Sequence, residues 1–422
     1  MRKLLALLLC TALLLTFSAC SNSNTEIHPT ETTEETKIVD TYPYPTIHNK
    51  LTWDAINAIP LKRSDMTIQE MRELCVQFMR FSKTAMWTPN DTVDFIRNAK
   101  GTEDQIVKGG IYAGLPYVGL GTGNVYRMMD HLNEETGVMD MELLRTLPKL
   151  FGNQCSCTTF WGWGRVVNSM GIAYTANMTQ SNGYLRVGPY TYPDNTLRFS
   201  EQYTTEKVCQ DNGLDIMCQS YAQLHLGDGL VYYTTAGHAI MASSEPHVEY
   251  TGNKINPTTS YITILEQSQR WEEYTNDAGD TAQVKNSVDK KMTFLDLFNN
   301  AYIPFTYAEF LGTKGVDETK CEINLSGDSV EANKLFNAKV TANFGISDIY
   351  VSLKKADGKE VYRLAVYADT PNERTLNISR AGNTFAWGDY DKLSGEYSVE
   401  VSVQLSTGER PVVYSGKVTI EN

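Results

Sequence analysis

The sequence predicts an α+β protein in which a mixed middle region is followed by a C-terminal β-sandwich. A capping-box pattern at Thr67-Ile68-Gln69-Glu70 precedes apolar residues at helical spacing, which predicts a helix. Apolar runs such as Tyr261–Leu265 are typical of strands. In the last hundred residues, apolar and polar side chains alternate along the chain, as in half-buried strands. The length of 422 residues allows two or three domains of roughly 150 residues each.

The composition argues against a nucleic-acid-binding protein and against an internal membrane span. Acidic residues number 50 and basic residues 37, giving a formal net charge of −13. This balance argues against a nucleic-acid partner, because phosphate neutralisation needs a basic face. A hydrophobic content of 41% with 21% charged residues is typical of a globular protein. Beyond the N-terminus no apolar run reaches about 18 residues, so no internal membrane span is expected.

The N-terminus has the pattern of an export signal. Arg2 and Lys3 precede an apolar run that ends in Ser18-Ala19-Cys20. Small residues before a cysteine resemble the bacterial lipobox, in which the peptidase cuts before the cysteine and its thiol receives diacylglycerol. Phe17 departs from that pattern, where leucine is usual. We expect residues 1–20 to be a lipoprotein signal peptide and Cys20 to be lipidated, with ordinary secretion as the alternative.

Lipidation would place the protein outside the cytoplasm, held to the bacterial cell membrane by acyl chains. Residues 21–45 are rich in Thr, Glu and Ser at their start and nearly lack bulky apolar side chains there, which predicts a disordered tether. The mixed region then extends over residues 46–317.

Residues 318–422 carry the strongest period-two pattern. Turn signals occur at Asp357-Gly358 and Ser406-Thr407-Gly408. Short alternating strands over about a hundred residues predict a β-sandwich of immunoglobulin-like size. No catalytic cluster is evident there, so we expect a separable interaction or spacer module.

Three segments of the middle region contain residues suited to catalysis. Cys155 and Cys157 open an apolar stretch that we expect to be a buried helix, and a thiol at a helix N-terminus is stabilised as thiolate. Among the six histidines, His238 alone follows a glycine and opens an apolar strand. Glu266 ends another strand. A thiolate, an imidazole and an acid that orients it form the cysteine version of the catalytic triad.

Residue types alone leave other interpretations open. In an extracytoplasmic protein Cys155 or Cys157 could instead form a disulfide with Cys209, Cys218 or Cys321. The sequence contains no HExxH and no paired C-x-x-C, so no metal site is expected, and no cofactor. The glycine-rich segment 119–124 fails the G-x-G-x-x-G pattern at its last position, which argues against a nucleotide site.

Four short motifs follow one another along the middle region: Gln154-Cys155-Ser156, Gly227-Asp228-Gly229-Leu230-Val231, Gly237-His238-Ala239-Ile240 and Ile264-Leu265-Glu266-Gln267. Their order resembles the CHAP family of cysteine- and histidine-dependent amidases and peptidases. An upstream segment, Gly114-Leu115-Pro116-Tyr117-Val118, is similar to one in the related NlpC-type peptidases. The resemblance covers roughly residues 110–270.

This resemblance implies a papain-like fold and a set of roles. Cys155 would be the nucleophile, His238 the base and Glu266 the acid that orients the imidazole. Tyr117, Gln154 and Asp228 would support the site or contact the substrate. Cys157 stands where the families have Gly or Trp, which leaves the choice between the two cysteines open. The gap between Cys155 and His238 is also longer than in short family members.

The resulting functional hypothesis is a lipid-anchored cell-wall hydrolase, a cysteine peptidase or amidase that cleaves an amide bond of peptidoglycan or its peptides. The alternative is a non-catalytic surface-binding or adhesion lipoprotein with an inactive papain-like domain.

Overall fold

The computed structural model describes residues 42–98, 100–171, 174–380 and 382–421. The expected signal peptide 1–20, the lipidation site Cys20 and most of the expected tether 21–45 lie outside the described residues. Residues from Pro43 onward form one compact unit. None of the helices in the described ranges has both the length and the apolar character needed to cross a bilayer.

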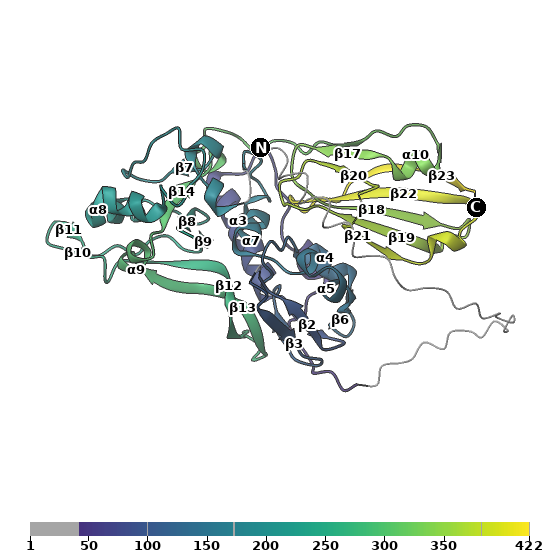
Figure 1. Cartoon of the computed structure of the whole chain (residues 1–422), viewed down its shortest axis with the longest axis horizontal. Helices are drawn as coiled ribbons and strands as arrows, with labels where there is room; N and C mark the ends of the chain where they lie inside the picture. The colour runs from purple at the N-terminus through teal and green to yellow at the C-terminus, as the bar shows by residue number, and fades with distance from the viewer. Residues whose placement is uncertain (1–41, 99, 172–173, 381, 422) are drawn as a thin grey trace, which may run out of the picture. The chain divides into compact units, whose positions relative to one another are not determined.

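The fold is α+β with mostly sheet, as predicted (Figure 1). A mixed ten-stranded sheet dominates the described part of residues 46–317. Its strands, in spatial order, are β5 (Leu132–Asn133), β6 (Val138–Met139), β1 (Met86–Pro89), β4 (Tyr112–Ala113), β13 (Thr281–Thr293), β12 (Tyr261–Thr275), β9 (Gly237–Ala242), β8 (Gly229–Tyr233), β14 (Ile303–Thr306) and β7 (Leu185–Arg186).

Helices and short elements surround this sheet. The helices are α2 (Trp53–Asn57), α3 (Ile68–Thr84), α4 (Val125–Asp130), α5 (Glu142–Thr146), α6 (Pro148–Phe151), α7 (Cys155–Trp163), α8 (Thr205–Tyr221) and α9 (Phe294–Asn299). The short elements are the 3₁₀ turns η1 (Thr175–Asn177), η2 (Gln180–Asn182) and η3 (Glu309–Leu311), and the strand pairs β2 (Val93–Ile96) with β3 (Glu103–Ile106) and β10 (Tyr250–Thr251) with β11 (Lys254–Ile255).

The long helix α3 begins where its capping box predicted. The Thr67 hydroxyl accepts from the Glu70 amide, and the Glu70 carboxylate accepts from the Thr67 amide. The apolar stripe of α3, including Leu74 and Phe78, is buried and the helix packs beside α7 (Figure 1). Because α7 also packs on β9, the start of α7 is held firmly against the sheet.

The strands β12 and β13 form a long antiparallel hairpin that contains an irregularity (Figure 1). Ile264 lies opposite Lys290, but Glu266 lies opposite Ser287, so β13 has an extra residue between these pairs. Asp289 in this bulge has φ 54, a left-handed conformation that is uncommon outside glycine. The bulge places both Ser287 and Lys290 within reach of the Glu266 carboxylate.

The C-terminal residues form two sheets on a common apolar core, the architecture of a sandwich. One sheet orders its strands as β16 (Ser329–Glu331), β23 (Val412–Ile420), β22 (Gly395–Leu405), β18 (Ile346–Lys354), β19 (Glu360–Tyr367) and β21 (Thr384–Trp387). The other contains β15 (Cys321–Ile323), β17 (Lys339–Ala342) and β20 (Thr375–Asn377), and the short elements α10 (Ala332–Phe336) and η4 (Tyr390–Lys392) complete the region.

A buried ion pair joins these sheets to the rest of the unit. Arg127 of α4 and Asp348 of β18 are both fully buried, with 2.5 Å between Nε and Oδ1. The same guanidinium donates to the carbonyls of Ser347 and Ala368, and Asn124 Nδ2 donates to Ser347 Oγ. Cutting the chain near residue 317 would therefore leave Arg127 as a buried charge without its partner. Whether the C-terminal sheets fold separately stays a prediction.

Candidate active site

Cys155 is the first residue of α7, with Gln154 as the extended N-cap residue. Its side chain is buried, at 4% exposure. Burial raises the pKa of the Cys155 thiol, but His238 and hydrogen bonds from the Ala239 and Ser156 amides outweigh burial and leave the pKa below its ordinary value. Cys155 is therefore stabilised as a thiolate.

His238 lies at the second position of β9, between the thiol and a carboxylate. Its Nε2 lies 3.0 Å from Glu266 Oε2, which leaves Nδ1 as the ring nitrogen for the hydrogen bond with Cys155. A side chain at Gly237 would collide with Thr175 Oγ1, which explains why glycine precedes the histidine. Burial lowers the pKa of His238, but Cys155 and Glu266 raise it to about 9. A thiolate paired with an imidazolium is the resulting protonation state near neutral pH.

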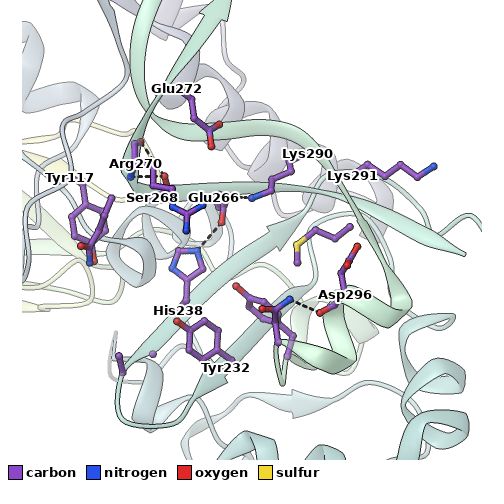
Figure 2. Close-up of a pocket in the computed structure, with 16 residues that line it drawn as sticks. Tyr117, Tyr232, His238, Glu266, Ser268, Arg270, Glu272, Lys290, Lys291 and Asp296 are labelled. Carbon is purple, nitrogen blue, oxygen red and sulfur yellow. Dashed lines mark hydrogen bonds and ion pairs between the residues drawn. The ribbon is translucent and has the colours of Figure 1, made fainter. Parts of the chain in front are cut away.

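Glu266 is fixed from three sides. Besides His238, its carboxylate accepts from Ser287 Oγ at 3.0 Å and from Lys290 Nζ at 2.8 Å. Burial raises the pKa of Glu266, but His238 and Lys290 lower it to about 2. Figure 2 shows the carboxylate between the imidazole and the Lys290 ammonium. An ionised, hydrogen-bonded carboxylate holds the orientation of the imidazole.

Cys157 has a different environment from Cys155. Residues two apart on a helix are rotated by about 200° about its axis, so the two side chains point to nearly opposite sides. Cys157 is 2% exposed and belongs to the apolar core. Gln154 Nε2 lies 3.4 Å from its sulfur. Burial raises the pKa of the Cys157 thiol to about 12, so this thiol is not activated.

The disulfide alternative finds no support in the described residues. The free cysteines there are Cys75, Cys155, Cys157, Cys209, Cys218 and Cys321.

A cavity of about 520 Å³ opens beside the imidazole and the carboxylate. Tyr117 and Tyr232 flank His238 in this cavity, as Figure 2 shows, and Tyr302 also lines it. Charged side chains of both signs line the rest of the wall: Arg270, Lys290, Lys291, Glu266, Glu272 and Asp296. Tyr117, which was expected to support the site or contact the substrate, lies in the wall of this cavity.

Asp228 and Gln154 were expected to support the site or contact the substrate, and neither lines this cavity. Asp228 is 1% exposed, and its carboxylate accepts from Arg72 Nη1 at 2.7 Å and from the His225 amide at 2.8 Å. Burial raises the pKa of Asp228 despite the neighbouring guanidinium. Asp228 is thus a buried structural residue that does not line the cavity.

Gln154 directly precedes Cys155. Its Oε1 accepts from the Leu120 amide at 3.2 Å and its Nε2 faces the Cys157 sulfur. The Gln154 side chain thus joins the start of α7 to the segment that contains Leu120, which is a supporting position.

Residue patterns missed several members of the site. Tyr232 lies opposite His238 in the β8–β9 register, so the hairpin Gly229–Ala242 could have identified it. Ser287 and Lys290 lie in the second half of β13, which is mostly polar and in which polar and apolar residues do not alternate. No group of three or more His, Cys, Asp or Glu side chains in the described ranges is arranged to hold a metal ion.

The shifted pKa values predict how stability depends on pH. The pKa of Glu266 is lowered from 4.5 to about 2, so its contribution is present above pH 4.5 and is lost as the pH falls through 2. The pKa of His238 is raised from 6.5 to about 9, so its contribution is present below pH 6.5 and is lost as the pH rises through 9. The free energy of unfolding, measured with urea across this pH range, should fall less at acid pH in Glu266→Gln than in the wild type. In His238→Ala it should fall less at alkaline pH than in the wild type. Unchanged slopes in both variants would contradict these shifts.

Comparisons with known proteins leave the chain unassigned. No protein-family model matches it, and no curated protein matches it. A solved structure of fibronectin(III)-like modules from Clostridium thermocellum CbhA is similar over 46% of this chain and 78% of that chain, with 11% sequence identity and a TM-score of 0.16. A similarity of this extent assigns neither a fold family nor a function.

Proposed function

We propose that the protein is a lipid-anchored cysteine hydrolase that cleaves an amide bond of bacterial peptidoglycan, with a papain-like catalytic region and an immunoglobulin-like sandwich. The observation that carries this proposal is the line Cys155–His238–Glu266, of which His238 and Glu266 line an open cavity. A thiol with a lowered pKa next to a histidine with a raised pKa is the arrangement of an activated nucleophile.

The geometry supports an acyl-transfer mechanism. The Cys155 thiolate attacks the amide carbonyl carbon, and the C–S bond forms while the carbonyl oxygen becomes an oxyanion. Backbone amides near the start of α7 stabilise that oxyanion. His238 gives its proton to the leaving nitrogen as the C–N bond breaks. Water then attacks the thioester, gives a proton back to His238, and releases the carboxylic acid and the thiolate.

The choice of substrate rests on the motif resemblance and on the expected lipid at Cys20. A lipid anchor on the outer face of the cell membrane would hold the hydrolase beneath the polymer on which it acts. Mass spectrometry of muropeptides, digested with the protein and with its Cys155→Ala form, tests the proposal. New fragments that require Cys155 would support it. Their absence, with a Cys155 thiol that does not react, would favour the binding or adhesion lipoprotein.

Glu266→Gln should keep the fold but lower turnover by a factor on the order of ten to ten thousand, because a neutral amide no longer stabilises the imidazolium. Muropeptide turnover under saturating substrate measures this effect. The matched control is Glu245→Gln, since Glu245 pairs with His225 at 2.9 Å on the surface outside the cavity. An equal loss in both variants would show that the effect is not specific to the site.

A further inference from the structure

Lys83 is a lysine enclosed within the protein behind the candidate active site. It lies in the last turn of α3 and is 1% exposed. Its Nζ donates to Gln267 Oε1 at 2.9 Å, and Gln267 in turn donates to the Leu115 carbonyl at 2.8 Å. Lys83 does not line the cavity. Its ammonium therefore has a neutral hydrogen-bond partner in a region without solvent.

Three of the five buried lysines and arginines of the described ranges, Arg72, Arg127 and Lys285, contact a carboxylate. Lys83 and Arg165 form no ion pair with any described residue. The Arg165 guanidinium lies over the Phe78 ring and donates to the Tyr126 hydroxyl and the Pro60 carbonyl, whereas Lys83 Nζ has the Gln267 amide oxygen. Burial of an ammonium without a carboxylate is costly, and an apolar side chain of similar volume would fill the same space more favourably. Core packing alone does not account for a lysine at this position.

The anionic groups that act on Lys83 belong to the candidate site. They are Glu266 from β12 and Cys155 from α7. α3 packs against both elements, and Ser82, which directly precedes Lys83, lines a small cavity together with Asn153 and Thr158 at the start of α7. Around Cys155 itself, the titratable groups are His238 from β9, Tyr232 from β8, Tyr117, Tyr302 and Cys157. Lys83 thus adds positive charge on the core side of the site, whereas His238 lies on the cavity side.

We propose that Lys83 is a positioning residue that favours the thiolate form of Cys155 from inside the core. It acts through the thiol and not on the substrate. The inference rests on the proposed function, because it assigns Lys83 to the same site.

The titration of Lys83 sets the pH range of this effect. Burial lowers the pKa of Lys83 to about 7, although Glu266 and Cys155 both raise it. The ammonium is therefore present below about pH 7 and is lost above it. Its support for the thiolate is greatest on the acid side, where the thiolate is otherwise most easily protonated.

The test is the pH dependence of iodoacetamide alkylation at Cys155 in the full chain, followed peptide by peptide with mass spectrometry. Lys83→Met should shift the acid limb of the rate profile to higher pH by about one unit, because removal of a nearby cation raises a thiol pKa. Lys83→Arg, which keeps a positive charge, should leave the acid limb at or below its wild-type position.

Lys285→Met is the matched control. Lys285 is buried to the same extent but pairs with Asp104, so its loss should leave the acid limb of Cys155 in place. An unchanged limb in folded Lys83→Met, or an equal shift in Lys285→Met, would overturn the inference. If Lys83→Met does not fold, a raised limb in Lys83→Arg would overturn it.

The same data separate this inference from the proposed function. If wild-type Cys155 is alkylated no faster than Cys157 at neutral pH, the proposed nucleophile fails. If wild-type Cys155 reacts fast and Lys83→Met leaves its profile unchanged, only the role of Lys83 fails.

Discussion

Cys155→Ala and His238→Ala should each abolish turnover, by a factor on the order of a million where nucleophile and base act as a unit. Cys157→Ala should keep most of the activity, because the Cys157 thiol lies in the apolar core and its pKa is raised to about 12. Cys155→Ala and Cys157→Ala make the same chemical change at positions two residues apart, so each serves as the control for the other.

Muropeptide release and alkylation by a thiol probe measure these outcomes together. The probe should label Cys155 at neutral pH and lose that label in Cys155→Ala. An inactive Cys157→Ala beside an active Cys155→Ala would reverse the assignment. If neither change affects release or labelling, the protein is not a cysteine hydrolase of this kind.

Arg127→Met should lower the free energy of unfolding by about 3–5 kcal/mol, because it leaves Asp348 as a buried charge without a partner. The double variant Arg127→Met/Asp348→Leu should recover much of that loss, since both charges are then removed. Equilibrium unfolding in urea measures both effects, and a double-mutant cycle gives the coupling between the two residues.

The control for this experiment is Arg145→Met. Arg145 pairs with Asp91 at 2.5 Å, a distance similar to that of the buried pair, but both side chains are about half exposed. Its loss should change stability by about 0–1 kcal/mol. Equal losses in Arg127→Met and Arg145→Met would show that burial of the ion pair is not what stabilises the junction.

The fold could be predicted where the chain carries a local signal. The Thr67–Glu70 capping box gave the start of α3, and the apolar run at Tyr261–Leu265 gave the first part of β12. The partner strand β13 gave no such signal, because its residues are mostly polar and its position comes from pairing with β12. Long-range pairing of this kind is not visible in local periodicity.

The candidate site was predictable for a different reason. Cys155, His238 and Glu266 lie far apart in the sequence, and it was the order of the motifs around them that placed them together. The same motifs left open whether Asp228 supports the site or contacts the substrate, because a Gly-Asp before a strand does not reveal that Arg72 covers the carboxylate. Period-two alternation at the C-terminus likewise could not reveal that Asp348 would be buried against Arg127.

The opposed directions of Cys155 and Cys157 have a consequence for oxidative damage. A low-pKa thiolate is readily oxidised to sulfenic acid, and a neighbouring thiol normally rescues it by forming a disulfide. Cys157 is close in sequence, but its sulfur is turned toward Gln154 and the core. Without a disulfide to Cys157, peroxide would carry Cys155 on to sulfinic acid, and the Cys155 thiol would be lost irreversibly.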